Sequence, residues 1–134
     1  MLKDYILNEA EKITLILARL AGLKEKAKPD EFIQLADTML LNEYNIKLEE
    51  LLSLKPDEFE LKLSIENYHP DKLEALAKLL YMYAEPFEPN PETLVGLQKV
   101  LTIFNMLEQK HHRSSFENIT KRNTIYQFVQ KNYE

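Results

Sequence analysis

Apolar residues recur every three or four positions along most of the chain, which is the spacing of one face of an α-helix. The pattern is strongest between His69 and His112, where two apolar runs flank the loop EPFEPNPET. Prolines at 86, 89 and 91 fix the φ angle in this loop and make it stiff. The runs are therefore predicted to form an antiparallel helical hairpin, the core of the fold, with Leu80 and Phe104 buried against each other's helices. The first run holds Leu73, Leu76, Ala77, Leu80, Tyr81 and Ala84, and the second holds Leu94, Leu97, Leu101, Phe104 and Leu107.

The same spacing predicts further helices on both sides of this hairpin. They are expected over about 3–26, from Pro29 to a left-handed stop at Asn45, over 47–54, over 56–65, and from Ser114 onward. Ser114 and Glu117 have the separation of a capping box. In this last helix, the residues expected to face the hairpin are Phe116, Ile119, Tyr126, Val129 and Tyr133. No segment has a sustained strand period, so the prediction is an all-α fold of antiparallel helical hairpins, five to seven helices in one domain over 1–134.

Three small or polar residues are expected to shape these helices. Asn90 is placed to cap the helix that begins at Pro91. Gly96 lies at the edge of an apolar face, where the missing side chain would let another backbone approach closely. Gly22 either ends the first helix early or permits close packing against a neighbour.

Composition narrows the classes of protein that fit this pattern. The chain has 134 residues, enough for one domain with a real core. The absence of cysteine excludes disulfides, thiolate catalysis and zinc–thiolate sites, and two glycines are too few for a glycine-rich phosphate loop. The opening MLKDYILNEAEK breaks its apolar run with Asn8, Glu9 and Glu11, so neither a signal peptide nor a membrane span is predicted. We expect a cytoplasmic protein.

Charge is unevenly distributed around a net value of −5. Residues 30–92 hold 15 acids and 5 bases, whereas residues 109–134 hold 5 bases and 2 acids. An acidic middle repels phosphate backbones and anionic membrane surfaces, and the weakly basic tail offers few phosphate contacts. Neither a nucleic-acid partner nor a membrane partner is expected.

Two resemblances follow from particular segments. The segment GLQKVLTIF at 96–104 resembles the second helix of a tetratricopeptide repeat, and LAKLLY at 76–81 resembles its first helix. The loop over 85–93 is longer and richer in proline than that family's tight turn. The chain also resembles a group of short, uncharacterised bacterial all-helical proteins that open with Asp-aromatic-Ile-Leu, here residues 4–7. These resemblances imply a tetratricopeptide-like array or bundle and a bacterial origin, without an activity or a site.

The clearest chemical candidate is Glu108 with His111 and His112, which have the spacing of one half of a helical metal site. A complete di-iron site needs a second such pair and two further carboxylates, whereas the only other histidine is His69. The basic residues at this helix end also suit the negative end of the helix dipole. Ser114 beside these histidines is already explained as a helix cap. No enzyme activity, cofactor, metal or small-molecule ligand is therefore predicted.

Exposed apolar residues are the remaining functional signal. Leu7 and Leu15 project outside the stripe that one packing surface of the first helix would cover, so either the helix is enclosed or its second side meets another chain. Tyr83 and Phe87, near the end of the first hairpin arm, complete the candidate interaction surface. The leading interpretation is a non-enzymatic protein-interaction or scaffolding module. The alternatives are a small self-assembling regulatory protein, and a metal protein or enzyme that uses Glu108, His111 and His112.

Overall fold

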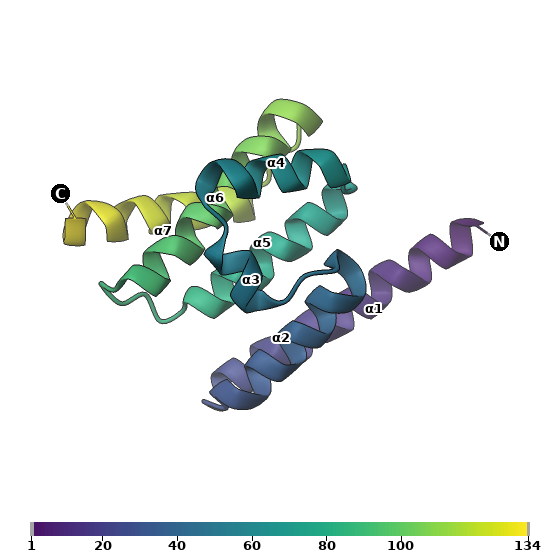
Figure 1. Ribbon diagram of the computed structural model, residues 1–134, viewed down its shortest axis with the longest axis horizontal. Helices are drawn as coiled ribbons and strands as arrows, with labels where there is room; N and C mark the ends of the chain where they lie inside the picture. Colours follow the sequence, from purple (N-terminus) through teal and green to yellow (C-terminus); the bar gives the residue numbers. More distant parts are fainter. Residues whose placement is uncertain (1, 134) are drawn as a thin grey trace. The chain divides into compact units, whose positions relative to one another are not determined.

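Every described element is an α-helix. The computed structural model of the protein describes the backbone of residues 2–133 and the side chains of residues 10–133, and no strand occurs in that part of the chain (Figure 1). The seven helices are α1 (Leu2–Glu25), α2 (Pro29–Tyr44), α3 (Leu48–Ser53), α4 (Pro56–Glu66), α5 (Pro70–Ala84), α6 (Pro91–His111) and α7 (Phe116–Tyr133). The predicted all-α fold is confirmed, and the two short segments are separate helices.

Proline followed by an acid starts four of these helices, namely α2, α4, α5 and α6. Proline suits this position because its missing N–H would have no partner in the first turn, and the acid favours the positive end of the helix dipole. Asn90 caps α6 as predicted, since its Oδ1 accepts a hydrogen bond from the Thr93 N–H at 2.8 Å. Proline, acid and cap together fix where the second arm of the central hairpin begins.

The helix ends depend on residues in the left-handed conformation. Asn45, Asn67 and His112 have φ of 56°, 52° and 52°, so the predicted stop at Asn45 is confirmed. Ala27 has φ of 55° just after α1. Both expectations for Gly22 are wrong, because α1 continues through it to Glu25 and a Cβ there would meet nothing within 4 Å.

The contacts between residues divide the chain into two compact units, 1–54 and 55–134. In the first unit, α1 and α2 run side by side and α3 follows α2. Their buried residues include Ile13, Leu20, Phe32 and Met39. The Leu48 N–H, at the start of α3, donates to Asp37 Oδ1 at 2.9 Å and ties α3 to α2. The single domain expected over 1–134 stays a prediction.

The second unit is built on the predicted hairpin. Helices α5 and α6 pack along their length, and α4 and α7 each lie against α6. Leu80 is 0% exposed and Phe104 2%, which confirms the predicted core face. Gly96 faces α5, but a Cβ there would come no closer than 3.7 Å to its neighbours, Ala84 and Tyr83. The close packing expected at Gly96 therefore does not require glycine.

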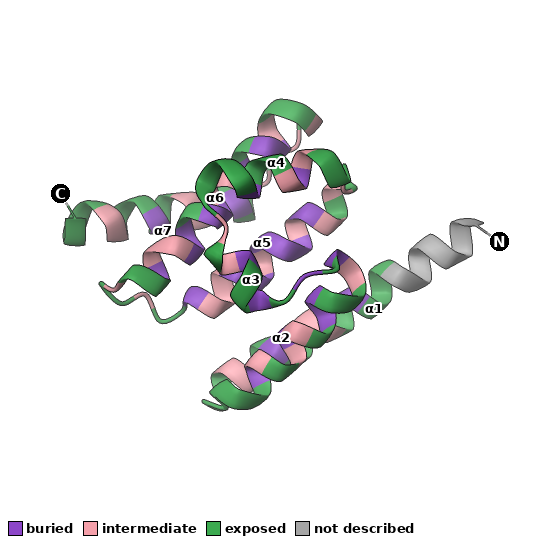
Figure 2. Cartoon of the chain, viewed as in Figure 1, coloured by how far each residue is buried: buried purple, intermediate pink, exposed green. Residues whose placement is uncertain are grey.

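Helix α7 presents a different face from the one predicted. Phe116 is 86% exposed, and Ile119, Tyr126 and Tyr133 are also exposed, whereas Ile125 and Asn118 are buried. Figure 2 shows buried residues along α5 and mostly exposed ones on α7. The predicted capping box is displaced as well, because Ser115, not Ser114, accepts the Asn118 N–H on its Oγ at 3.0 Å. Apolar residues lie on more than one side of α7, and two adjacent serines precede it. Helical periodicity does not indicate which side faces the hairpin or which serine caps the helix.

Candidate functional site

An open groove runs along α1 and α2 in the first unit. Its volume is about 660 Å³, and its lining is formed chiefly by Lys12, Leu15, Ile16 and Arg19 of α1 and by Leu35 and Thr38 of α2. Leu15 is 66% exposed, because it lies on the opposite side of α1 from the buried residues Ile13 and Leu20. The sequence predicted that Leu15 would stand outside the packing stripe, and it does.

Charge in this groove has one sign. Lys12 and Arg19 are seven residues apart on the same helix, with Leu15 and Ile16 between them, and no acidic residue is among the lining residues. Within the described part of the chain neither cation takes part in an ion pair. Leu7, the other predicted surface residue on α1, has a side chain outside the described residues. The groove therefore combines an apolar wall with two positive charges.

Phe87 belongs to a chain of aromatic rings within the second unit. Its ring centroid lies 5.2 Å from that of Tyr81 and 5.4 Å from that of Phe128, both in edge-to-face geometry. The ring centroids of Phe128 and Tyr133 lie 6.2 Å apart, and the Tyr133 hydroxyl donates to the Asn90 carbonyl at 3.5 Å. These contacts hold the loop between α5 and α6 against α7. The half-buried Phe87 thus has a packing role, and its role in binding a partner stays a prediction.

Tyr83 is half-buried beside a smaller hollow of about 200 Å³, whose rim carries Glu85, Glu88 and Glu92. Burial, and secondarily the charge of Glu92, raises the pKa of Tyr83. Glu88 accepts a hydrogen bond from Asn90 Nδ2 at 3.3 Å. The interaction role predicted for Tyr83 is likewise untested by this geometry.

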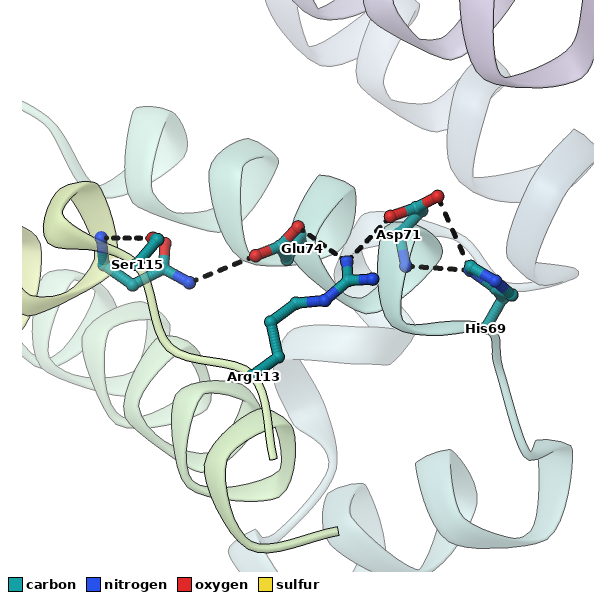
Figure 3. Close-up of polar contacts among 6 residues, drawn as sticks. His69, Asp71, Glu74, Arg113 and Ser115 are labelled. Atoms are coloured by element: carbon teal, nitrogen blue, oxygen red, sulfur yellow. Dashed lines mark hydrogen bonds and ion pairs between the residues drawn. The ribbon is translucent and has the colours of Figure 1, made fainter. Parts of the chain in front are cut away.

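Arg113 is the centre of a polar cluster that sequence reasoning missed (Figure 3). Its Nη1 lies 2.7 Å from Asp71 Oδ1 and 3.0 Å from Glu74 Oε2, both on α5. The hydrogen bond to Asp71 is the largest cause of the raised pKa of Arg113. Glu74 also accepts from Asn118 Nδ2 of α7, at 3.4 Å. The cluster therefore ties the connection between α6 and α7 to the first turns of α5.

His69 stands at the edge of the same cluster. Its Nδ1 accepts the Asp71 N–H at 3.1 Å, so His69 caps α5. The same Nδ1 lies 3.6 Å from Asp71 Oδ2. The role of His69 in this arrangement is structural.

Among the residues of the possible metal site, Glu108 makes an ion pair within the second unit. Glu108 Oε1 lies 3.0 Å from Arg122 Nη2, and the other terminal nitrogen of Arg122 donates to Asn105 Oδ1 at 2.9 Å. His112 ends α6 in the left-handed conformation and is exposed. No group of three or more His, Asp or Glu side chains is placed to hold a metal ion among the residues that the structure describes. Glu108 therefore anchors α7 to α6.

Lys99 is a second residue that the sequence did not single out. It is only 4% exposed, and its Nζ lies 5.1 Å from the ring centroid of Phe59 on α4. Burial lowers the pKa of Lys99 because a charged amine is poorly solvated there. The signal available in the sequence was its spacing from Gly96 and Ile103, which lie three residues before it and four after it on the buried side of α6.

Two further comparisons concern membrane-spanning helices and known proteins. Over the described part of the chain, no helix has both the length and the apolar character needed to cross a bilayer. No protein-family model, curated protein or solved structure matches the chain.

Proposed function

We propose that the chain is a non-enzymatic helical interaction module that acts in the cytoplasm and binds a protein partner in the groove between α1 and α2. The observation that supports this most directly is Leu15, a large aliphatic side chain that is 66% exposed on the wall of a groove of about 660 Å³. Burying a leucine stabilises a complex by roughly 1.5–3 kcal/mol. A partner that covers Leu15 gains part of that free energy, because Leu15 is 66% exposed beforehand.

The roles of the polar residues also favour an interaction module. Glu108 holds Arg122, Arg113 holds two carboxylates of α5, and Ser115 caps α7. Each of these side chains makes a contact that stabilises the helices of the second unit. Helical arrays of the kind the chain resembles present grooves between helices, which is the mode of binding proposed here.

The test uses two exposed leucines as a matched pair. Leu15→Glu places a charge in the groove, whereas Leu61→Glu places it on α4, where Leu61 is 60% exposed. Both variants should keep the circular dichroism and the urea midpoint of the wild type, because neither leucine is in the core. Each protein is then immobilised, and the proteins it retains from an extract of the native cells are quantified by mass spectrometry.

The expected result is a small set of proteins that the wild type and Leu61→Glu retain and Leu15→Glu loses. The proposal fails if Leu15→Glu is folded and retains the same proteins as the wild type, since the groove then binds nothing. A self-assembling regulatory protein, the alternative, would instead appear as a wild-type dimer that Leu15→Glu converts to a monomer in sizing chromatography.

A further inference from the structure

The charges beside the groove restrict what it can bind. Lys12 and Arg19 lie seven residues apart on α1, which is about 10.5 Å along a helix axis. Leu15 and Ile16 lie between them, so the lining carries a cation near each end and apolar side chains in the middle. Leu35 and Thr38 form the opposite wall on α2 without adding a charge.

Among the side chains of the first unit that the structure describes, no carboxylate pairs with Lys12 or Arg19. An apolar partner surface without acids would cover Leu15 but would partly desolvate both cations, which costs free energy. A partner with carboxylates beside its apolar residues covers Leu15 and pairs the cations.

The shape of the groove indicates the form of that partner. A groove between two side-by-side helices is the usual seat for a third helix, which inserts apolar side chains at i, i+3, i+4 and i+7. Carboxylates seven residues apart on such a helix match the spacing of Lys12 and Arg19. We infer that the groove between α1 and α2 receives an amphipathic helix of another protein with carboxylates flanking its apolar stripe, an inference that rests on the proposed function.

A second copy of this chain fits the groove less well. A symmetric dimer uses the same patch on both subunits. Two such patches would bring Lys12 and Arg19 of each copy into one interface, where like charges oppose association. The acidic helix of a different protein brings charge of the opposite sign.

The experiment measures binding of two fluorescein-labelled peptides by anisotropy. Both have about 16 residues, alanine-based helices and leucines at i, i+3, i+4 and i+7. One carries glutamates beside the leucines at seven-residue spacing, and the other carries lysines at the same positions. The wild-type chain should bind the glutamate peptide at least about tenfold more tightly than the lysine peptide, with a preference that shrinks as salt rises.

Variants assign the binding to the groove. Leu15→Glu should abolish binding of the glutamate peptide, and Leu61→Glu should leave it unchanged. The double variant Lys12→Glu/Arg19→Glu should reverse the preference, so that the lysine peptide binds more tightly. Because all these side chains are exposed, the folded state should persist in each variant, which circular dichroism checks.

Three results of the peptide measurements would overturn the inference: failure of both peptides to bind, equal affinity for both, or a glutamate preference that survives the double charge reversal. A wild-type dimer that Leu15→Glu dissociates would also overturn it in favour of a second copy. The proposed function fails separately, in the capture experiment, if Leu15→Glu retains every protein that the wild type retains.

Discussion

Ala27 occupies a position that favours glycine. Its φ of 55° is in the left-handed region, and it is held there because the Lys28 N–H donates to the Leu23 carbonyl at 3.0 Å and closes the end of α1. A side chain with a Cβ pays roughly 1–2 kcal/mol in this conformation. We expect Ala27→Gly to raise the free energy of unfolding by about 0.5–1 kcal/mol, after the greater entropy of an unfolded glycine is subtracted. Urea unfolding checks this, and a lower midpoint would contradict it.

The raised pKa of Tyr68 predicts that the protein loses stability at alkaline pH. Burial, and secondarily the charge of Glu66, raises the pKa of Tyr68 to about 12 from its ordinary value of 10.0. Below pH 10 the hydroxyl is neutral in both states and contributes no pH dependence. Between these two pKa values the unfolded chain loses the proton first, so the free energy of unfolding falls as pH rises.

The corresponding variant is Tyr68→Phe. It should show a smaller loss of stability than the wild type between about pH 10 and 12, measured by urea unfolding at each pH. Tyr126→Phe, at an exposed tyrosine of α7, serves as the control for loss of a hydroxyl. Identical pH profiles for the wild type and Tyr68→Phe would contradict the prediction.

At the scale of helices, Arg113 is the polar contact that joins the α6–α7 connection to α5. Its Nη1 lies close to both Asp71 and Glu74, whereas Lys28 makes an exposed ion pair with Glu31, three residues further along the chain. Arg113→Met should lower the free energy of unfolding by about 0.5–1 kcal/mol, and Lys28→Met by no more than about 0.5 kcal/mol. Thermal or urea unfolding of both variants gives the comparison. Equal effects would show that Arg113 does not hold α7.

The helices themselves were predictable because the sequence marks their starts locally. Proline and an acid at 29–30, 56–57, 70–71 and 91–92 place four helix starts, and Asn90 adds a side-chain cap. The inward face of α7 was not predictable in this way. Phe116 and Tyr126 lie on one side of the helix and Ile125 on another, and only the position of α6 decides which side is covered.

One residue of the candidate groove, but not the groove itself, was predictable from the sequence. The excess of apolar positions on α1 identified Leu15 from the sequence, since one neighbour cannot cover every side of a helix. The groove beside it required α2, because Leu35 and Thr38 come from a helix whose rotation the sequence does not specify. The Arg113 cluster joins residues about 40 positions apart, at separations that spacing rules within one helix do not reach.

For the molecule as a whole, the division into two compact units predicts that the second unit folds on its own. Residues 55–134 contain the entire α5–α6 hairpin with its buried residues, together with the helices that lie against it. We expect this fragment, expressed alone, to give a helical circular dichroism spectrum and to unfold cooperatively. Leu80→Ala within the fragment should cost about 2–5 kcal/mol of stability. A disordered fragment would instead favour the single domain predicted from the sequence.

Helix α7 buries few residues against the rest of the second unit, and this affects how it moves. Only Asn118 and Ile125 of this helix are buried, and its other contacts with the rest of the unit include the polar contacts of Asn118 and Arg122 and aromatic rings near its end. A helix with so little burial opens at a lower free-energy cost than the hairpin beneath it. In native-state hydrogen exchange, the amides of α7 therefore exchange well before those of α5 and α6. Each opening exposes the Phe128 and Phe87 rings to solvent while the hairpin stays folded.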